Sequence, residues 1–385
     1  MSEASWLHNA TIYHILIDRF AGFPSIDHSD EPVFIGGTLK GITEHLSYLQ
    51  RLGVTAIWIS PFYRTSAYHG YHITDFLSVD PHFGTKQDLK DLIDQTHKRG
   101  MKILADFVPN HCSKFHPFFI DAQKNSNSPY RQWFYFTKWP EEYLCFLSIS
   151  DLPKLNLNNQ EVRQHIIDAA LYWLSLGFDG FRLDHVIGPS HRFWKYFVSS
   201  VKKEYPQIVL IGEAWMQGIK FHELNTIHMD GKLWKWLRGN SSDTLLTSYI
   251  GVLDGVLDFR VQQLMKQYVS DASCSKDDLN AMFSNHFKKY PSSYVLPVFL
   301  DNHDMDRFMF SCKNNVELLK DAAKILFSLE QPIIIYYGTE LGMSQQKSIW
   351  SMTDYGDILA RAPMQWDKVD TSLFSFYQDL IKRRN

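Results

Sequence analysis

The chain has 385 residues, of which 45% are hydrophobic and 21% are charged, so it is long enough for one large barrel or for two to three smaller domains. Its formal net charge of −3 and the lack of long basic runs argue against nucleic acid or an anionic membrane as a partner. No apolar stretch approaches the roughly 18 residues of a membrane span, and the first residues lack the pattern of a signal peptide.

The cysteines are widely separated and include no CxxC pair; they are Cys112, Cys145, Cys274 and Cys312. This spacing is more typical of free thiols in a reducing compartment than of a disulfide framework or a zinc site. We therefore expect a cytoplasmic location.

Short apolar segments alternate with amphipathic ones along the first third of the chain. The pattern predicts strands at 11–17, 54–59 and 102–107, with helices at 43–52 and 86–99 between them. The alternation then stops at residues 108–155, which are rich in proline and polar side chains. We interpret this segment as a short inserted subdomain.

The alternation resumes after residue 155. Further helices are expected at 160–176 and 190–204, and further strands at 180–183, 208–212, 256–259, 294–300 and 332–336. Eight strand–helix units predict an α/β fold, the (β/α)8 TIM barrel, because such alternation gives a parallel sheet. The barrel would comprise residues 1–107 and 156–385, with the inserted subdomain at 108–155 after the third strand. A doubly wound open sheet is the alternative topology.

The segment Gly177–His185 (GFDGFRLDH) carries charged residues in an apolar strand. A strand places residues two apart on the same face, so Arg182 and Asp184 point the same way. An arginine beside a carboxylate near the end of a strand would hold that carboxylate ionised, as a nucleophile requires. A buried Arg–Asp pair that serves only the fold is the alternative.

Acidic residues stand at or just past the ends of four different predicted strands; they are Asp106, Asp184, Glu213 and Asp304. Barrel enzymes carry their chemistry on the loops at the C-terminal ends of the strands. Because like charges repel, four acids at one rim are poorly explained by stability alone. They therefore indicate an active site.

Four motifs occur in a fixed order: DFVPNH (106–111), GFDGFRLDH (177–185), GEAW (212–215) and FLDNHD (299–304). Together they resemble the motifs of the alpha-amylase family of retaining glycoside hydrolases. DLPKLN (151–156) resembles the MPKLN motif of the neopullulanase and cyclomaltodextrinase branch, and YHGYHITDF (68–76) is similar to the loop after the family's second strand. The resemblance extends from Ile12 to about Asn385.

The resemblance implies a role for each matched acid. Asp184 would be the nucleophile, Glu213 the general acid/base, and Asp304 the third carboxylate, which holds the sugar's hydroxyls. Glycoside cleavage with retention needs two carboxyl groups of unequal pKa about 5–5.5 Å apart. Arg182 beside Asp184 would lower one pKa, and nearby negative charge with apolar neighbours would raise that of Glu213.

Other matched residues would bind the sugar. His111 and His303 match histidines that hydrogen-bond the sugar in the −1 subsite, and Tyr71 matches the aromatic platform beneath it. His185 belongs to the acceptor-side contacts, which differ between hydrolases and transferases of the family. Taken alone, His111 and His303 could instead be structural histidines, and Tyr71 could be a core tyrosine.

No cofactor is expected to be required. Asn110 matches a calcium ligand in many amylases, and its side-chain carbonyl oxygen suits Ca²⁺ as a hard cation. The alternative is that Asn110 only braces its loop, since the inserted segment offers no acid-rich calcium loop. A metal-dependent barrel hydrolase drawing on the 17 histidines is a further alternative, but the first strand lacks an HxH motif.

The chain departs from relatives in three places. His72 stands where many exo-acting α-glucosidases carry the aspartate of GYD, and the loop is closer to the GYW of endo-acting amylases. We also expect the chain to lack the N-terminal β domain of the neopullulanase branch and the C-terminal β-sandwich. The last helix or a partner subunit would then cover the barrel edge, so a homo-oligomer is one of the two possibilities.

These observations imply a retaining α-glucan hydrolase that cleaves α-1,4 bonds of maltooligosaccharides and starch-like glucans. It would act through a covalent glycosyl–enzyme intermediate, within the glucan chain and with some transglycosylation. Glucosyl transfer, isomerisation or α-1,6 cleavage on the same scaffold are alternatives. A non-catalytic binding relative would typically have lost the nucleophile or the acid, and both are present here.

Overall fold

The structure is a computed structural model, and it describes residues 5–24, 30–216, 242–271, 274–352, 355–369 and 372–384. The chain divides into two compact units. Unit 1 is formed mainly by Pro61–Pro81 and Leu104–Val256, and unit 2 mainly by the chain up to Ser60, by His82–Ile103 and by the chain from Leu257 onward. Within the ranges described, no helix is both long and apolar enough to cross a membrane.

All eight predicted barrel strands are present, some of them shorter than expected. They are β1 (Thr11–Ile15), β2 (Ala56–Ile59), β5 (Lys102–Phe107), β8 (Gly180–Leu183), β9 (Val209–Gly212), β10 (Gly255–Val256), β11 (Val298–Phe299) and β12 (Ile333–Tyr336). In unit 1 the neighbours run β5, β8, β9, β10, and in unit 2 they run β11, β12, β1, β2, with parallel pairing in both.

The pairing of β1 with β12 decides between the two predicted topologies. The first and the last strand of the alternation are hydrogen-bonded neighbours, with Thr11 opposite Ile333. A closed barrel requires this pairing. In an open doubly wound sheet, the chain starts in the middle of the sheet and builds outward to both edges, so the first and last strands are not neighbours. The strands are buried along nearly their whole length, as expected for a parallel sheet that is covered on both faces.

Glycine at position 180 lets β8 lie close to β9. A Cβ atom there would stand 2.0 Å from the carbonyl oxygen of Val209, and the φ angle of Gly180 is 157°. Any other residue would push apart the two strands that carry Arg182 and Ile211, which are register partners. The tight GFDG turn therefore contributes directly to the geometry at the far end of β8.

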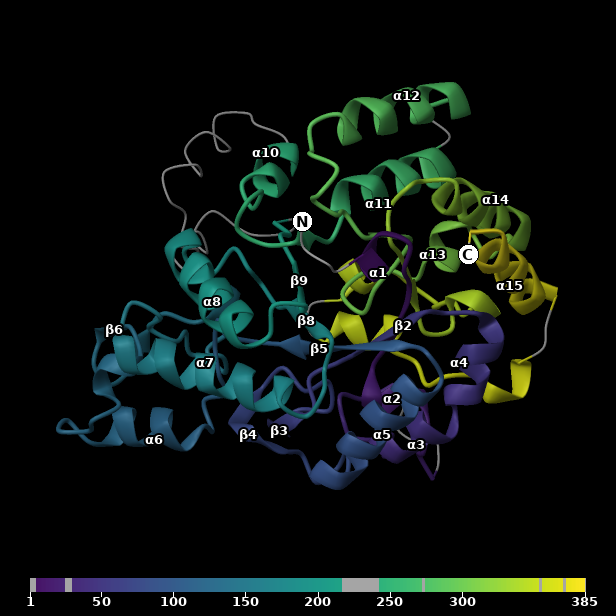
Figure 1. Ribbon diagram of the computed structural model, residues 1–385. Helices are drawn as coiled ribbons and strands as arrows, with labels where there is room; N and C mark the ends of the chain where they lie inside the picture. The colour runs from purple at the N-terminus through teal and green to yellow at the C-terminus, as the bar shows by residue number, and fades with distance from the viewer. Residues whose placement is uncertain are drawn as a thin grey trace. The chain divides into compact units, whose positions relative to one another are not determined.

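In the ranges that the structure describes, unit 1 also contains α-helices and two short antiparallel hairpins. These are α6 (Pro117–Lys124), α7 (Gln160–Leu174), α8 (His191–Glu204), α10 (Ser242–Thr247), β3 (Tyr63–Thr65) with β4 (Ile73–Val79), and β6 (Phe136–Lys138) with β7 (Glu142–Tyr143). Helix α7 starts where the side chain of Asn159 accepts hydrogen bonds from the next backbone N–H groups. Helices α7 and α8 pack side by side (Figure 1).

The segment 108–155 leaves β5 and returns beside its own starting point. Isolated bridges pair His111 with Lys154 and Cys145 with Pro153. The structure keeps this segment inside unit 1. Its status as a separate inserted domain, with the barrel at 1–107 and 156–385, stays a prediction. The four cysteines are free thiols.

Among the described residues, the α-helices of unit 2 are α1 (Ser5–His8), α2 (Ile17–Phe20), α3 (Leu39–Glu44), α4 (Leu46–Leu52), α5 (Lys86–Lys98), α11 (Phe259–Lys266), α12 (Lys276–Phe287), α13 (Phe308–Ser311), α14 (Val316–Phe327) and α15 (Ser372–Arg384). The helix predicted at 43–52 is instead divided into α3 and α4 at His45. The break arises because His45 leaves the helical conformation while its Nδ1 hydrogen-bonds the carbonyl oxygen of Gly41 at 2.8 Å.

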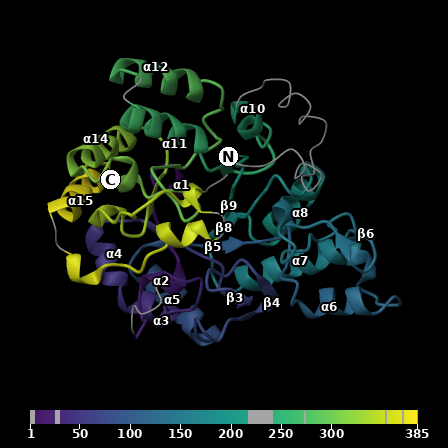
Figure 2. The same cartoon turned by 180° about the vertical axis from the view of Figure 1, so that it is seen from behind.

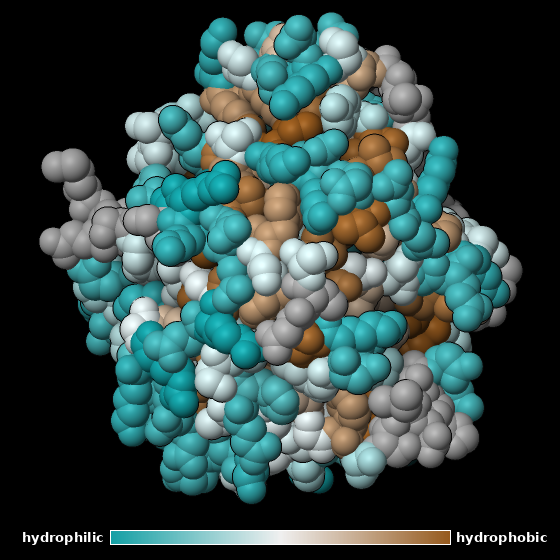
Figure 3. All heavy atoms as spheres, turned by 90° about the vertical axis from the view of Figure 1, so that its right-hand side faces the viewer, coloured by the Kyte–Doolittle hydropathy of each residue, from teal (hydrophilic) through white to brown (hydrophobic). Residues whose placement is uncertain are grey.

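Helix α15 lies against α14 and α4 (Figures 1 and 2). It buries Leu373, Phe374, Tyr377 and Ile381, and Arg384 donates to the carbonyl oxygen of Leu329 at 2.7 Å. The face of the molecule on this side is mostly hydrophilic, with hydrophobic residues visible between the polar ones (Figure 3).

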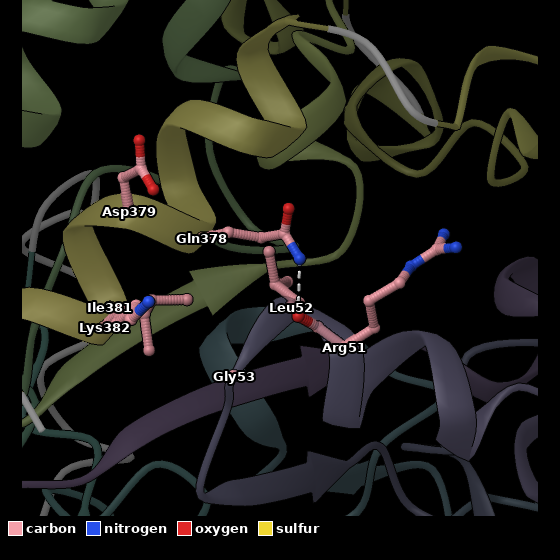
Figure 4. A pocket seen from close by; sticks show the side chains of 7 residues that line it. All are labelled: Arg51, Leu52, Gly53, Gln378, Asp379, Ile381 and Lys382. Carbon is pink, nitrogen blue, oxygen red and sulfur yellow. Dashed lines mark hydrogen bonds between the residues drawn. The ribbon is translucent and has the colours of Figure 1, made fainter.

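A hollow of about 580 Å³ lies where α15 passes the end of α4. Gln378 is one of its lining residues and donates to the carbonyl oxygen of Arg51 at 2.6 Å (Figure 4). Because Leu52 and Gly53 precede β2, this hollow belongs to the N-terminal ends of the strands. It is therefore not part of the site built at their C-terminal ends.

Candidate active site

The register of β5 and β8 builds the centre of the site. Asp106 and Arg182 are direct partners across the two strands, so their side chains lie on the same face. Arg182 Nη1 lies 2.9 Å from each carboxylate oxygen of Asp106 and 2.8 Å from Asp184 Oδ1. Arg182 Nη2 lies 2.7 Å from Glu213 Oε1. One guanidinium therefore joins three carboxylates that come from three adjacent strands.

Asp184 and Glu213 each follow the last residue of a strand. The backbone N–H of Asp184 donates to the carbonyl oxygen of Phe107 at 2.8 Å, and that of Glu213 donates to the carbonyl oxygen of Leu183 at 2.9 Å. Both residues therefore extend the hydrogen-bond ladder of the sheet by one step. Since one carboxylate oxygen of each contacts the same planar guanidinium, these two oxygens lie within about 8 Å of each other. Both carboxylates can therefore reach one substrate.

The ionic cluster is almost fully buried. The exposed fraction is 1% for Arg182, 0% for Asp106, 6% for Asp184 and 7% for Glu213. Burial acts to lower the pKa of Arg182, but Asp106 and Glu213, with Tyr71 and Asp184, raise it well above its usual value. Burying three carboxylates and one cation carries a large desolvation penalty, so such a cluster is a poor means of stabilising a core. The arrangement is better explained by chemistry than by the alternative of a structural Arg–Asp pair.

The turn after Asp184 is held against Glu213. The backbone N–H of His185 donates to Glu213 Oε2 at 3.1 Å, and that of Val186 donates to the carbonyl oxygen of Glu213 at 3.0 Å. His185 adopts a φ of 43°, which costs a non-glycine residue on the order of 1 kcal/mol. This strained turn directs an N–H group at the carboxylate of Glu213.

Tyr71 lies at the edge of the cluster. Its hydroxyl donates to Asp106 Oδ2 at 2.8 Å, and the guanidinium carbon of Arg182 lies 6.0 Å from the centroid of its ring. Asp106 is thus the residue that connects the tyrosine to the arginine. From the sequence, Asp106 was predicted to stand at the end of a strand and was recognised as part of the DFVPNH motif, but no role was predicted for it.

The ring of Phe146 lies close to two buried histidines. The ring centroid of Phe146 lies 4.9 Å from that of His111 and 4.6 Å from that of His185. Burial lowers the pKa of His111 to about 3 and that of His185 well below its usual value. Both imidazoles are therefore neutral near neutral pH, and a neutral imidazole can donate one hydrogen bond and accept another.

Phe146 was missed by the sequence analysis. It lies in the 108–155 segment, outside every motif, and its side chain is only partly buried. The next two residues, Leu147 and Ser148, have φ angles of 44° and 63°, so the backbone beside this ring is strained. No local pattern could have placed it beside the two histidines.

In unit 2, Asp304 and His303 form a second ionic group. His303 Nε2 lies 3.1 Å from Asp304 Oδ2, and Arg361 Nη2 lies 2.8 Å from Asp304 Oδ1. Arg361 also donates from Nε to the carbonyl oxygen of His303 at 2.8 Å and forms an ion pair with Asp357. Arg361 lies outside the motifs from which the site residues were predicted. The convergence of Asp304 and His303 with the unit 1 residues stays a prediction.

Within the ranges that the structure describes, no group of three or more His, Cys, Asp or Glu side chains is arranged to hold a metal ion. Asn110, which matches a calcium ligand in many amylases, contacts a lysine in this structure. Asn110 Oδ1 accepts a hydrogen bond from Lys154 Nζ at 3.1 Å.

Comparison with known proteins identifies the family. The model of the alpha-amylase catalytic domain matches residues 14–384. The chain belongs to the alpha-amylase family. Its membership and its (β/α)8 barrel fold, both predicted from the sequence, are confirmed.

Similar proteins come from several bacteria. Alpha-amylase 2 of Dictyoglomus thermophilum is 36% identical over 384 residues, which are 98% of this chain and 63% of that protein. A cyclomaltodextrinase of a Bacillus species is 32% identical over 99% of this chain and 66% of its own length. Thus the chain spans somewhat less than two thirds of each of these two curated relatives.

A solved structure with the same fold is the cyclic alpha-maltosyl-(1→6)-maltose hydrolase of Arthrobacter globiformis in complex with cyclic alpha-maltosyl-(1→6)-maltose. It superimposes with a TM-score of 0.83 at 27% identity, covering 100% of this chain and 84% of that one. These relatives include the cyclomaltodextrinase branch that the DLPKLN motif predicted.

Proposed function

We propose that this chain is a retaining hydrolase of α-1,4-linked glucans, acting within maltooligosaccharides and starch-like chains and transferring some glycosyl units to sugar acceptors. The observation that carries the proposal is the single guanidinium of Arg182, shared by Asp184, Glu213 and Asp106. Family membership supports it, because relatives of this chain are amylases and a cyclomaltodextrinase by name.

In the proposed reaction, Asp184 attacks the anomeric carbon while Glu213 gives its proton to the departing glycosidic oxygen. A glycosyl ester of Asp184 forms and the C–O bond to the leaving sugar breaks. Glu213 then removes a proton from water, or from a sugar hydroxyl, which attacks the same carbon and frees Asp184. Arg182 favours the ionised form of Asp184 through the 2.8 Å contact between them; because the same guanidinium also lies 2.7 Å from Glu213 Oε1, the proton that Glu213 gives up would stand on Oε2.

The remaining predicted residues would hold the sugar. Tyr71 would lie beneath the ring as a platform, and Asp304 with His303 would bind hydroxyl groups. His111 and His185, being neutral, can each donate to one hydroxyl and accept from another. No step requires a cofactor. A cytoplasmic location and a homo-oligomer remain proposals from the sequence.

The test uses Asp184→Asn, which removes the nucleophile's charge and keeps its shape. Turnover of maltoheptaose should be lost while the thermal unfolding midpoint stays near that of the wild type. Asp179→Asn, at the opposite end of β8, is the matched control and should stay active. Appreciable turnover by Asp184→Asn would exclude this residue as the nucleophile, and a non-catalytic binding protein would show no turnover in the wild type either.

The products distinguish the finer claims. Retention predicts that the new reducing ends, formed when the ester of Asp184 is hydrolysed, carry the α configuration, which NMR spectroscopy of fresh digests reads directly. Cutting within the chain predicts products of several lengths at early times, whereas an exo-acting enzyme releases one length. Early β-anomeric products would contradict the covalent intermediate.

A second substrate class follows from one comparison. The Arthrobacter relative is named for hydrolysis of a cyclic glucan with α-1,6 links. Cleavage of cyclic or branched glucans, α-1,6 bonds included, is therefore the second candidate. Rates on linear, cyclic and branched glucans decide between the two.

A further inference from the structure

Lys154 lies at the junction of three loops in unit 1. Its ammonium donates to Asn110 Oδ1 at 3.1 Å and to the carbonyl oxygen of Gly188 at 2.9 Å, and its exposed fraction is 2%. Asn110 follows β5, Lys154 ends the 108–155 segment, and Gly188 ends the turn that begins at Asp184. A single amino group, whose pKa burial lowers to about 7, therefore ties together three segments that are far apart in the sequence.

The backbone around this junction is built for close approach. The N–H of Leu155 donates to the carbonyl oxygen of Asn110 at 3.0 Å, so the two loops are also joined beside the lysine. A Cβ atom on Gly188 would stand 2.1 Å from Asn110 Oδ1. Glycine is therefore needed at 188, because only its bare Cα lets this carbonyl face the same cation as the asparagine oxygen.

The two oxygen atoms that Lys154 contacts are those a hard cation would use. An amide oxygen and a backbone carbonyl are typical calcium ligands, but Ca²⁺ takes six to eight oxygens at about 2.3–2.6 Å. Here Lys154 Nζ lies within hydrogen-bond distance of both oxygens. A divalent ion at the same place would be repelled by the ammonium, so Asn110 does not fit a calcium site.

We propose that the ammonium of Lys154 stands in place of a bound cation at this junction and holds the turn after Asp184 in position. Lys154 is thus a positioning residue: it fixes Gly188 on one side of the turn, while Glu213 holds the N–H groups of His185 and Val186 on the other. The turn that carries Asp184 is clamped from both sides by groups of the chain itself.

The primary test measures thermal unfolding of the full chain, a readout that does not depend on the proposed function. The wild-type midpoint should be the same in EDTA and in millimolar calcium. Lys154→Met, which keeps the length but not the charge, and Lys154→Gln, which keeps donors without charge, should both unfold several degrees lower. Lys114→Met is the control, since Lys114 is 40% exposed in its pair with Asp151 and should unfold near the wild-type temperature.

A second readout rests on the proposed function. Assayed well below its unfolding midpoint, Lys154→Gln should lose kcat on maltoheptaose with a smaller change in KM, because the turn behind the nucleophile is displaced. A purely structural role would leave kcat of the folded variant unchanged. If the wild type has no glucan activity, the proposed function fails, while the thermal measurements still decide the role of Lys154.

Two results would overturn the inference. One is a calcium-dependent rise of the wild-type midpoint that disappears in Asn110→Leu, which would place a metal ion at this junction. The other is that Lys154→Met and Lys154→Gln both unfold at the wild-type temperature, which would show that the charge of Lys154 does not stabilise the turn.

Discussion

Replacing Arg361 with methionine should weaken catalysis through Asp304. Arg361 comes from the segment before α15, and its guanidinium is the cation that contacts Asp304 Oδ1 at 2.8 Å. Its Nε also donates to the carbonyl oxygen of His303 at 2.8 Å. Methionine fills a similar volume but leaves this carboxylate without its cation, so Asp304 becomes free to turn away from the sugar.

The expected size of the effect follows from the burial of the pair. The side chain of Arg361 is 6% exposed and that of Asp304 is 30% exposed, so solvent screens the interaction in part. A hydrogen bond to a charged group contributes about 1.5–3 kcal/mol, and the partial exposure favours the lower end. If Asp304 binds the sugar mainly in the transition state, kcat should fall on the order of tenfold, with a smaller change in KM.

The assay compares kcat and KM on maltoheptaose for the wild type, Arg361→Met and Arg361→Lys. Lysine keeps the charge without the planar fork and should lie between the other two. Asp357→Asn is the control, because it removes the other carboxylate paired with Arg361 and leaves Asp304 its cation. Wild-type kcat in Arg361→Met, or a larger loss in Asp357→Asn, would refute the reasoning.

Two further predictions concern His116 and Phe146. Burial lowers the pKa of His116 to about 4, below about 6.5 in the unfolded chain, so its contribution to stability is full above pH 6.5 and is lost as the pH falls toward 4. His116→Asn, which keeps an acceptor for the backbone N–H of Phe118, should remove about 3 kcal/mol of this pH dependence in urea unfolding; equal slopes in both proteins would contradict the assignment. Phe146→Ala should raise KM for maltoheptaose several-fold with little change in the unfolding midpoint, because its partly exposed ring borders the histidine that contacts Glu213 through its backbone. Phe115→Ala, whose ring is 55% exposed, should leave KM unchanged.

The strands and the fold class were accessible from the sequence because each strand is encoded locally. An apolar run such as Lys102–Phe107 is recognisable without knowing its neighbours, and the structure gives β5 the same bounds. Helix boundaries were less predictable. The break at His45 depends on a hydrogen bond to Gly41 that no periodicity reveals.

The candidate site was predicted to the extent that its residues follow strands. Asp184 and Glu213 were selected for that reason, and the structure places both on one guanidinium. Phe146 and Arg361 were not selected, because they lie in irregular segments. Their places are determined by contacts with residues many positions away, such as the 57 positions between Arg361 and Asp304.

The sequence by itself determined the alternation of strands and helices and which acids stand at strand ends, since both depend on local order along the chain. Only the tertiary structure decided which of those charges meet. Asp106 and Arg182 are 76 positions apart and come together through the register of β5 and β8. Likewise, Lys154 reaches Asn110 and Gly188 because the 108–155 segment returns to its origin, a path that hydrogen bonding and packing select and that local sequence does not encode.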